Sequence, residues 1–185
     1  MSVDAPAHVR TTRLDLRPAD PDDTDALFPI FNDPAGWWFE PESRHLDIDT
    51  TRQFLVRAHD RWALHGLSYW TVRLADEQTV IGLGGTQRHR SGAWNLSYRI
   101  AGAQHGQGYA RELATAGLAA AAAVDPTEAV IAWVTPHNQP SRRVAEHVGL
   151  VDRGMRIDAN DGRSRLAFAD RELDPERFPF AEPAT

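Results

Sequence analysis

Residues 98–112 read YRIAGAQHGQGYARE, a short strand-like run followed by a glycine-rich turn and the start of a helix. The unpaired amides at a helix N-terminus and the positive end of the helix dipole favour an anion, phosphate above all. Glycine lets the backbone approach such an anion because no Cβ stands in the way. The segment therefore indicates a phosphate-binding turn, although a plain strand-to-helix connection without a ligand could contain the same glycines.

Two common nucleotide-binding motifs do not fit this turn. A P-loop needs a Gly-Lys-Ser/Thr sequence, and all 20 basic residues counted as Lys and Arg are Arg in this chain. A dinucleotide fingerprint needs Gly or Ala three places after its second Gly, where Arg111 stands. A P-loop nucleotidase and a nicotinamide-dependent oxidoreductase are therefore both disfavoured.

Hydrophobic periodicity predicts strands and helices on both sides of the turn. On the C-terminal side we expect a helix to about residue 124, a strand at 129–134, a helix at 141–148 closed by Gly149, and strands at 151–157 and 165–169. On the N-terminal side we expect strands at 94–100, 80–86 and 69–74, a helix from Thr50 to Leu64 with Thr50 and Gln53 as capping box, a long loop at 32–49, a helix from the Asp20 cap to Phe31, and an edge strand at 14–16.

This order, β-α-α-β-β-β-α-β-α-β-β, predicts an α/β (α+β) fold with a mixed sheet. Strand, helix and strand at 94–134 imply one parallel crossover in an otherwise antiparallel sheet. The glycines of residues 80–86 suggest a bulge or a close approach of the backbone to a neighbour.

Length and composition limit the function classes. The 185 residues suit a single domain, which we place at residues 8–173 with a loosely attached tail at 174–185. The net charge of −6 disfavours nucleic acid as a partner. The absence of Cys excludes disulfides, a thiolate zinc site and a cysteine nucleophile.

Two further classes are disfavoured by pattern. The 8 His residues show no i, i+4 pair joined to a carboxylate, so we expect no metal site. No run approaches the ~20 apolar residues that span a bilayer, and the first residues lack the pattern of a secretory signal. We therefore expect a cytoplasmic protein without a membrane partner.

Several segments resemble the GNAT N-acetyltransferases, most closely the branch that contains the RimJ and RimL type enzymes. Residues 106–110, with Glu112 soon after, are similar to the acetyl-CoA signature Arg/Gln-x-x-Gly-x-Gly/Ala. Residues 12–17 and 80–85 resemble the opening and third strands of that branch, and residues 138–150 resemble its Asn-x-x-Ser segment. The resemblance covers nearly the whole chain and implies the GNAT fold, with acetyl-CoA as co-substrate.

The resemblance also implies roles by position. The backbone of residues 98–100 would pair with the pantetheine arm, and the amides of residues 106–111 would hold the pyrophosphate. Asn138 would hydrogen-bond the arm, and Ser141 would lie near the sulfur and protonate or stabilise the leaving thiolate. The residues so assigned to acetyl-CoA are Tyr98, Arg99, Ile100, His105, Gly106, Gln107, Gly108, Tyr109, Ala110, Arg111, Asn138 and Ser141.

Three positions depart from the family pattern. His105 stands where the signature has Arg or Gln, so the side chain that faces phosphate at this position would carry no charge at pH 7. Ala145 stands where some relatives carry a tyrosine acid, which leaves Ser141 or water for that task. Asn95 stands where many relatives have a Glu, so the general base is undetermined.

The acceptor site is expected in the long loop at residues 32–49. Trp37 and Trp38 would line a pocket for the acceptor, or would instead fill the core below the loop. Glu40, His89 and His137 are candidate bases, and Glu40 and His89 are also candidate acceptor contacts. A lone His or Glu can equally be an ordinary surface group.

We therefore expect an enzyme that moves the acetyl group of acetyl-CoA to a primary amine by direct attack in a ternary complex. The acceptor would be a small-molecule amine or a protein N-terminus, and an acidic protein suits a cationic one. A homodimer is compatible with this function. The alternative is an acyl-CoA-binding module that has lost catalysis, which the departures at His105, Asn95 and Ala145 leave open.

Overall fold

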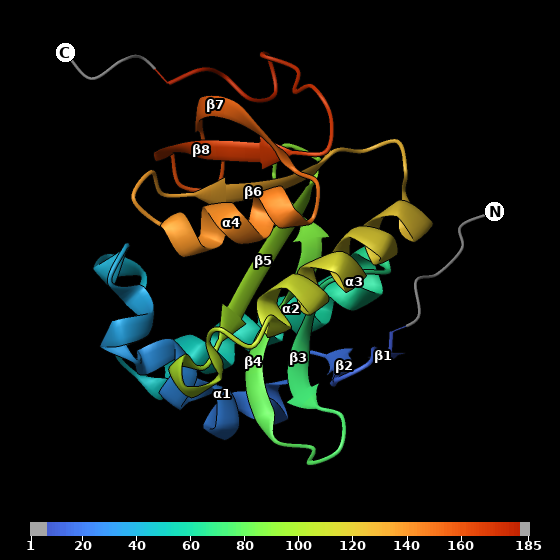
Figure 1. Cartoon of the computed structure of the whole chain (residues 1–185), viewed down its shortest axis with the longest axis vertical. Coiled ribbons are helices and arrows are strands. Elements are labelled where there is room, and N and C mark those ends of the chain that lie inside the picture. Colours follow the sequence, from blue (N-terminus) through green and yellow to red (C-terminus); the bar gives the residue numbers. More distant parts are fainter. Residues whose placement is uncertain (1–6, 182–185) are drawn as a thin grey trace.

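An eight-stranded sheet forms the centre of the molecule (Figure 1). The computed structural model describes residues 7–181. The strands are β1 (Val9–Arg10), β2 (Leu14–Pro18), β3 (Tyr69–Leu74), β4 (Val80–Arg88), β5 (Trp94–Ile100), β6 (Val130–Val134), β7 (Val151–Ile157) and β8 (Ser164–Ala169). Their order across the sheet is β1-β2-β3-β4-β5-β6-β8-β7, and all neighbouring pairs are antiparallel except β5 and β6. The mixed sheet confirms the predicted fold class.

The helices cover both faces of this sheet. They are α1 (Thr24–Asn32), α2 (Ile48–His65), α3 (Tyr109–Val124) and α4 (Gln139–His147), with short 3-10 turns η1 (Pro21–Asp23), η2 (Pro34–Trp37), η3 (Pro41–Ser43) and η4 (Gly102–Gln104). Leu83 of β4 packs with Leu27 of α1 and Leu55 of α2. The next residue, Gly84, faces Leu113 of α3 on the other side, as successive residues of a strand do. None of the helices in the described part of the chain is long and apolar enough to cross a lipid bilayer.

Helix α3 lies very close to the sheet at the glycines of β4. A Cβ at Gly117 of α3 would lie 3.3 Å from the Gly85 Cα atom and 3.1 Å from Leu96 Cδ1. A Cβ at Gly84 would lie 2.4 Å from the carbonyl oxygen of Ser97. The prediction of a close approach at these glycines is confirmed, and the contact fixes the position of α3 and of the turn that precedes it.

Strands β5 and β6 form the parallel pair that the sequence predicts, but they pair only briefly. Trp94 and Asn95 of β5 pair with Val130 and Ile131 of β6. Beyond that point β5 continues to Ile100 beside β4, whereas β6 continues beside β8 and the two strands diverge (Figure 1). One edge of the second half of β5 therefore has no strand beside it within residues 7–181.

Several local expectations need correction. Helix α2 is capped by Asp47, whose side chain accepts from the Thr50 amide, so the predicted capping box at Thr50 is wrong. Asp20 caps the 3-10 turn η1 rather than α1 itself. The strand expected at the sheet edge is covered by β1, which pairs Val9 with Leu16. Gly149, with φ of 89°, follows α4 as predicted.

The C-terminal segment is held more firmly than its three prolines suggest. Phe178 is only 2% exposed and packs in a cluster with Trp133 of β6. The Phe178 carbonyl accepts from Arg156 Nη1 at 2.9 Å, and the Pro179 carbonyl accepts from the Ile157 amide at 2.9 Å. The prediction of a loosely attached tail is therefore wrong for residues 174–181, because an aromatic anchor and backbone bonds outweigh the proline content. Its last residues, 182–185, lie outside the described part.

We expect Phe178→Ala to lower the free energy of unfolding by about 3 kcal/mol, the usual cost of truncating a buried Phe. Phe180→Ala is the matched control, since Phe180 is 60% exposed, and it should cost less than about 1 kcal/mol. Urea denaturation followed by tryptophan fluorescence measures both values. Equal losses for the two variants would contradict the anchoring of the tail by Phe178.

Candidate active site

A cavity of about 980 Å³ lies where β5 and β6 separate. Its walls come from the loop between α1 and α2, from β5, from the turn that precedes α3, and from the start of α4. The residues that line it include Gly36, Trp37, Trp38, Phe39, Glu40, Ser97, Tyr98, Arg99, Ile100, Gln104, His105, Gly106, Gln107, Gly108, Tyr109, Ala110, Arg111, Trp133, Thr135, Asn138, Ser141, Arg143 and Arg165. All the residues assigned to acetyl-CoA from the sequence are therefore brought together around one cavity.

The edge of β5 can receive an extended chain. Tyr98 and Arg99 pair with Gly84 and Leu83 of β4 on one side. On the other side, the backbone groups of this part of β5 face the cavity, where an extended ligand can bond to them like an added strand. The Ile100 carbonyl oxygen lies 2.9 Å from His105 Nε2, so this His binds the strand instead of standing free as a phosphate ligand.

The turn before α3 presents backbone amides without side-chain competition. Gly106 and Gly108 have φ of 78° and 83°, in the left-handed region that glycine adopts without strain. Gly108 is the N-cap of α3, and no side chain caps this end of the 16-residue helix. A Cβ at Gly106 would meet nothing within 4 Å, so the space beside this turn is open.

The carboxylate in the first turn of α3, Glu112, has a structural role. Glu112 Oε1 accepts from Thr11 Oγ1 at 2.6 Å and from the Arg13 amide at 2.9 Å, and Oε2 accepts from Arg13 Nε at 2.7 Å. Burial alone would raise the pKa of Glu112, but the bonds from Thr11 and Arg13 outweigh it and lower the pKa below its ordinary value. Glu112 thus ties the start of β2 to α3 and holds the turn in place.

The cavity is basic although the chain as a whole has a net charge of −6. Four of its lining residues are Arg and one is Glu. Within residues 7–181, Arg99, Arg111 and Arg143 have no carboxylate at ion-pair distance, whereas Arg165 and Glu40 are paired with each other. Arg111 and Arg143 are exposed beside the starts of α3 and α4 and leave positive charge for the phosphates of a nucleotide cofactor.

Ser141 and Tyr98 meet at the wall of the cavity. Tyr98 Oη donates to the Ser141 carbonyl at 2.9 Å and lies 3.1 Å from Ser141 Oγ. Burial raises the pKa of Tyr98 to about 12, with the bond to Ser141 opposing the rise, so this hydroxyl stays protonated near neutral pH. Asn138, expected to bind the cofactor arm, also caps α4 by accepting from the Ser141 amide at 3.2 Å. The Tyr98–Ser141 contact was not predicted, because it joins residues 43 positions apart in sequence.

Asn95 has a structural partner in a buried tyrosine of β3. Its Nδ2 donates to Tyr69 Oη at 2.8 Å, and burial raises the pKa of Tyr69 to about 12. Ala145, at the position of the tyrosine acid in some relatives, is fully buried. Neither position offers a group that titrates near neutral pH.

The aromatic residues of the α1–α2 loop serve both core and cavity. Trp37 packs on the cluster around Phe31 and donates its ring N–H to the Phe31 carbonyl at 2.6 Å, while it also lines the cavity. Trp38 is 52% exposed and lies edge-on to Phe39 and His137. Trp37 is thus part of the core and of the wall, and Trp38 is a residue of the rim.

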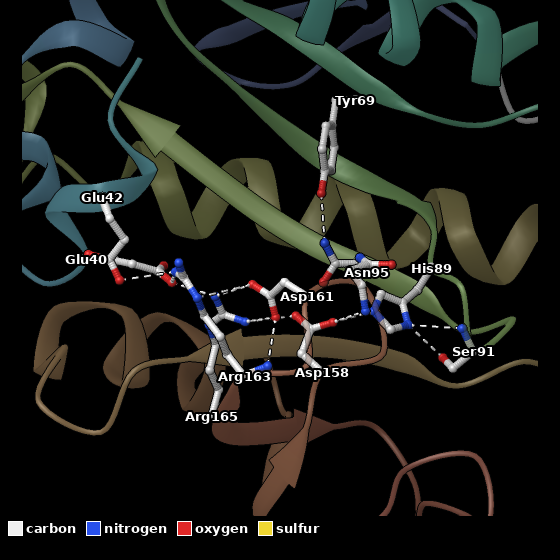
Figure 2. A network of polar contacts seen from close by, with 11 residues as sticks. Glu40, Glu42, Tyr69, His89, Ser91, Asn95, Asp158, Asp161, Arg163 and Arg165 are labelled. Atoms are coloured by element: carbon white, nitrogen blue, oxygen red, sulfur yellow. Dashed lines mark hydrogen bonds and ion pairs between the residues drawn. The ribbon is translucent and has the colours of Figure 1, made fainter. Parts of the chain in front are cut away.

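Glu40 belongs to a polar network that joins the α1–α2 loop to the β7–β8 hairpin (Figure 2). It pairs with Arg163 Nη1 at 2.7 Å and with Arg165, which also contacts Asp161 at 2.8 Å and Asp158 at 3.0 Å. Burial alone would lower the pKa of Arg165, but its bonds to Asp161 and Glu40 outweigh it and raise the pKa. Glu40 is already engaged by both guanidinium groups, which disfavours its predicted role as a base.

The two histidines proposed for chemistry lie outside the group of residues that line the cavity. His89 has no exposed side-chain surface, and its ring nitrogens lie 2.9 Å from Asp158 Oδ1 and 2.8 Å from Ser91 Oγ at the far end of the network in Figure 2. The prediction that His89 binds the acceptor is therefore wrong, since the ring is buried behind the hairpin. His137 is exposed, and its Nε2 lies 3.1 Å from the Phe39 carbonyl, so it braces the rim of the cavity.

No group of three or more His, Asp and Glu residues within the described chain is arranged to hold a metal ion. The unpaired edge of β5, the open glycine turn and the unpaired arginines instead fit a long anionic cofactor that ends in a pantetheine arm. Such a cleft between two diverging parallel strands, with an open glycine turn at the next helix, can receive an acyl-CoA molecule. A family model described as an acetyltransferase (GNAT) domain matches residues 13–151, and the chain belongs to this family.

Solved structures share the fold at low sequence identity. An acetyltransferase from Agrobacterium tumefaciens is 22% identical with a TM-score of 0.74, over 89% of this chain and 94% of that one. A ribosomal-protein-S5-alanine acetyltransferase from Vibrio fischeri is 16% identical with a TM-score of 0.70, over 89% and 96%. RimL, a ribosomal L7/L12 α-N-protein acetyltransferase solved with coenzyme A, is 18% identical with a TM-score of 0.68, over 92% and 98%. No curated protein sequence matches the chain.

We expect Gly106→Val to weaken binding of acetyl-CoA at least tenfold, because its side chain would occupy the open space beside the amides of the turn. Gly154→Val is the matched control. Gly154 has φ of 83°, close to the 78° of Gly106, and also has nothing within 4 Å of its Cβ direction, but it lies on β7 away from the cavity. Both variants should lose about 1–2 kcal/mol of stability from backbone strain. Calorimetric titration with acetyl-CoA measures the difference, and equal affinity of both variants would remove this turn from the cofactor site.

Proposed function

We propose that this GNAT acetyltransferase moves the acetyl group of acetyl-CoA to a primary amine, in a small molecule or at a protein N-terminus, by direct attack in a ternary complex. The observation that carries the proposal is the free edge of β5, which lies beside the Tyr98–Ser141 pair in one cavity with the glycine turn. When bound, acetyl-CoA supplies an activated thioester, and the chain has to orient it, admit an amine and handle two protons.

The strand edge and the turn would hold the cofactor at two separated points. Backbone groups of Tyr98, Arg99 and Ile100 would bond to the pantetheine arm, and amides between Gly106 and Arg111 would bind the pyrophosphate. A backbone amide at this edge can also stabilise the oxyanion of the tetrahedral intermediate, because it is fixed in the sheet before the reaction begins. The cofactor-binding residues taken from the sequence all retain these roles in the proposal, with His105 acting by bracing Ile100.

Ser141 would donate a proton to the departing sulfur. Its hydroxyl lies 3.1 Å from Tyr98 Oη, and Tyr98 remains a neutral donor because burial raises its pKa to about 12. Because the Tyr98 proton is donated to the Ser141 carbonyl, Tyr98 Oη can accept from Ser141 Oγ at 3.1 Å. The Ser141 hydroxyl would turn from Tyr98 to the sulfur when it donates its proton. Tyr98 is then a positioning residue, and Ser141 is the group in contact with the reacting atoms.

The amine would lose its proton to solvent water rather than to a fixed carboxylate. Glu40 is engaged by Arg163 and Arg165, and Asn95 is neutral. We assign Glu40 to the shape of the acceptor wall, together with Trp37 and Trp38. His137 would act in the same wall through its contact with the Phe39 carbonyl.

The proposal is tested by CoA release in the presence of acetyl-CoA and a panel of amino acids, polyamines, amine antibiotics and short peptides. We expect release with at least one class of amine, and initial-rate lines that intersect, as a ternary complex requires. Parallel lines would indicate an acetyl-enzyme instead. Binding of acetyl-CoA without release by any amine would favour the alternative, an acyl-CoA-binding module without catalysis.

We expect Ser141→Ala to lower kcat about 10- to 100-fold with little change in the affinity for acetyl-CoA, which is typical of the loss of a proton donor. Tyr98→Phe should lower kcat less. Tyr69→Phe is the matched control, since it also removes a buried hydroxyl with a pKa of about 12, but one that contacts Asn95 rather than Ser141. An unchanged kcat in Ser141→Ala would reduce Ser141 to a residue of the first turn of α4.

A further inference from the structure

The acceptor end of the cavity contains one cation that the protein does not neutralise. Arg99 follows Tyr98 on β5, and because alternate residues of a strand face opposite sides, its side chain lies on the side of α1, α2 and their loop. There Arg99 donates from Nη1 to the Gly36 carbonyl. No carboxylate within residues 7–181 lies at ion-pair distance from Arg99.

Aromatic rings hold this guanidinium at a fixed place in the wall. Its central carbon lies 3.6 Å from the centroid of the Trp37 ring and 5.5 Å from that of the Phe39 ring. Because an aromatic ring covers the flat face of the guanidinium, a ligand can bond only to the N–H groups that point outward in its plane. Since Nη1 donates to Gly36, the remaining N–H groups can donate to the two oxygens of an anion in the cavity.

The nearby acidic groups do not replace such an anion. Burial lowers the pKa of Arg99 to about 10, and the charges of Glu40 and Asp33 only partly oppose this effect. Glu40 is held by Arg163 and Arg165, so its charge is already balanced. A buried charge without a hydrogen-bonded counter-ion costs free energy, and a ligand that supplies the counter-ion recovers it.

We propose, on the basis of the proposed acetyltransferase function, that the acceptor carries a carboxylate beside its amine, which Arg99 binds while its guanidinium stays stacked on the Trp37 ring. The expectation from the sequence is instead that an acidic protein suits a cationic acceptor, with Glu40 as a candidate contact. The carboxylate can belong to a free α-amino acid or to an acidic first residue of a peptide, and the chemistry that Arg99 recognises is the same in both.

Paired acceptors test the proposal. The probes are α-amino acids against their α-amides, and C-terminally amidated peptides that begin with Asp or Glu against those that begin with Asn or Gln. O-phosphoethanolamine against ethanolamine tests a phosphate instead. We expect wild-type kcat/KM to favour the carboxylate member of at least one pair tenfold or more, as a hydrogen bond to a charged group allows. The pair that shows the preference identifies the source of the carboxylate.

Arg99→Met should reduce this preference to less than about twofold, and Arg99→Lys should restore part of it. A variant that merely disturbs the α1–α2 loop would lower both members of a pair equally and leave their ratio unchanged. Arg52→Met is the control, because Arg52 is on α2 and pairs with Asp49 outside the cavity. A wild-type enzyme that treats both members alike, or that prefers only the phosphate member, overturns the proposal, as does an Arg99→Met variant that keeps the preference.

Failure of this inference differs from failure of the acetyltransferase function. If amines without a carboxylate are acetylated best, the enzyme is an acetyltransferase and the role of Arg99 is overturned. If no probe releases CoA, thermal shifts of the CoA-bound protein with N-acetyl amino acids and N-acetyl amino acid amides give the same comparison without turnover. We then expect a larger shift for the carboxylates in wild type and equal shifts in Arg99→Met, and equal shifts in wild type overturn the proposal.

Discussion

The early end of the pairing between β5 and β6 is the constraint on which the active site depends. Two residue pairs hold these parallel strands together at Trp94 and Asn95, after which each strand follows its other neighbour. A strand edge inside a sheet normally has its hydrogen bonds satisfied by the next strand, so the gap creates directed donors and acceptors in the interior of the molecule. The cavity, the turn before α3 and the start of α4 are all arranged around this gap.

The arginines that line the cavity differ in their surroundings at its two ends. Arg111 and Arg143 stand exposed where the turn before α3 and the start of α4 offer helix N-termini, so positive charge is concentrated at the cofactor end. At the other end, Arg165 is neutralised by carboxylates and the guanidinium of Arg99 is stacked on the Trp37 ring. A chain with a net charge of −6 can thus attract an anionic cofactor, because the local arrangement of the arginines outweighs the total charge.

Structural features that depend on neighbouring residues could be predicted from the sequence, whereas contacts between residues far apart in the sequence could not. The element order, the parallel crossover and the glycine turn depend on local periodicity and on turn residues. The contact of Tyr98 with Ser141 and the ion pairs of Glu40 depend on which segments the fold brings together. The alternation of β5 could have placed Arg99 on the side opposite Tyr98, but could not have shown that its guanidinium stacks on Trp37. The anchoring by Phe178 was hidden because a single aromatic residue among prolines has no periodicity.

The network around Glu40 also bears on the order in which the molecule acquires its parts. Glu40 and Arg165 are separated by 125 positions. Closing a loop of that length costs an unfolded chain about 4 kcal/mol of free energy, because the chain loses conformational entropy. The ion pairs cannot offset this cost unless the sheet has already brought β8 near the α1–α2 loop. The proposed acceptor wall therefore needs both the first and the last third of the chain in place. A chain that is still incomplete during synthesis lacks β8 and therefore cannot form this network, so the proposed recognition of the acceptor would be coupled to completion of the fold.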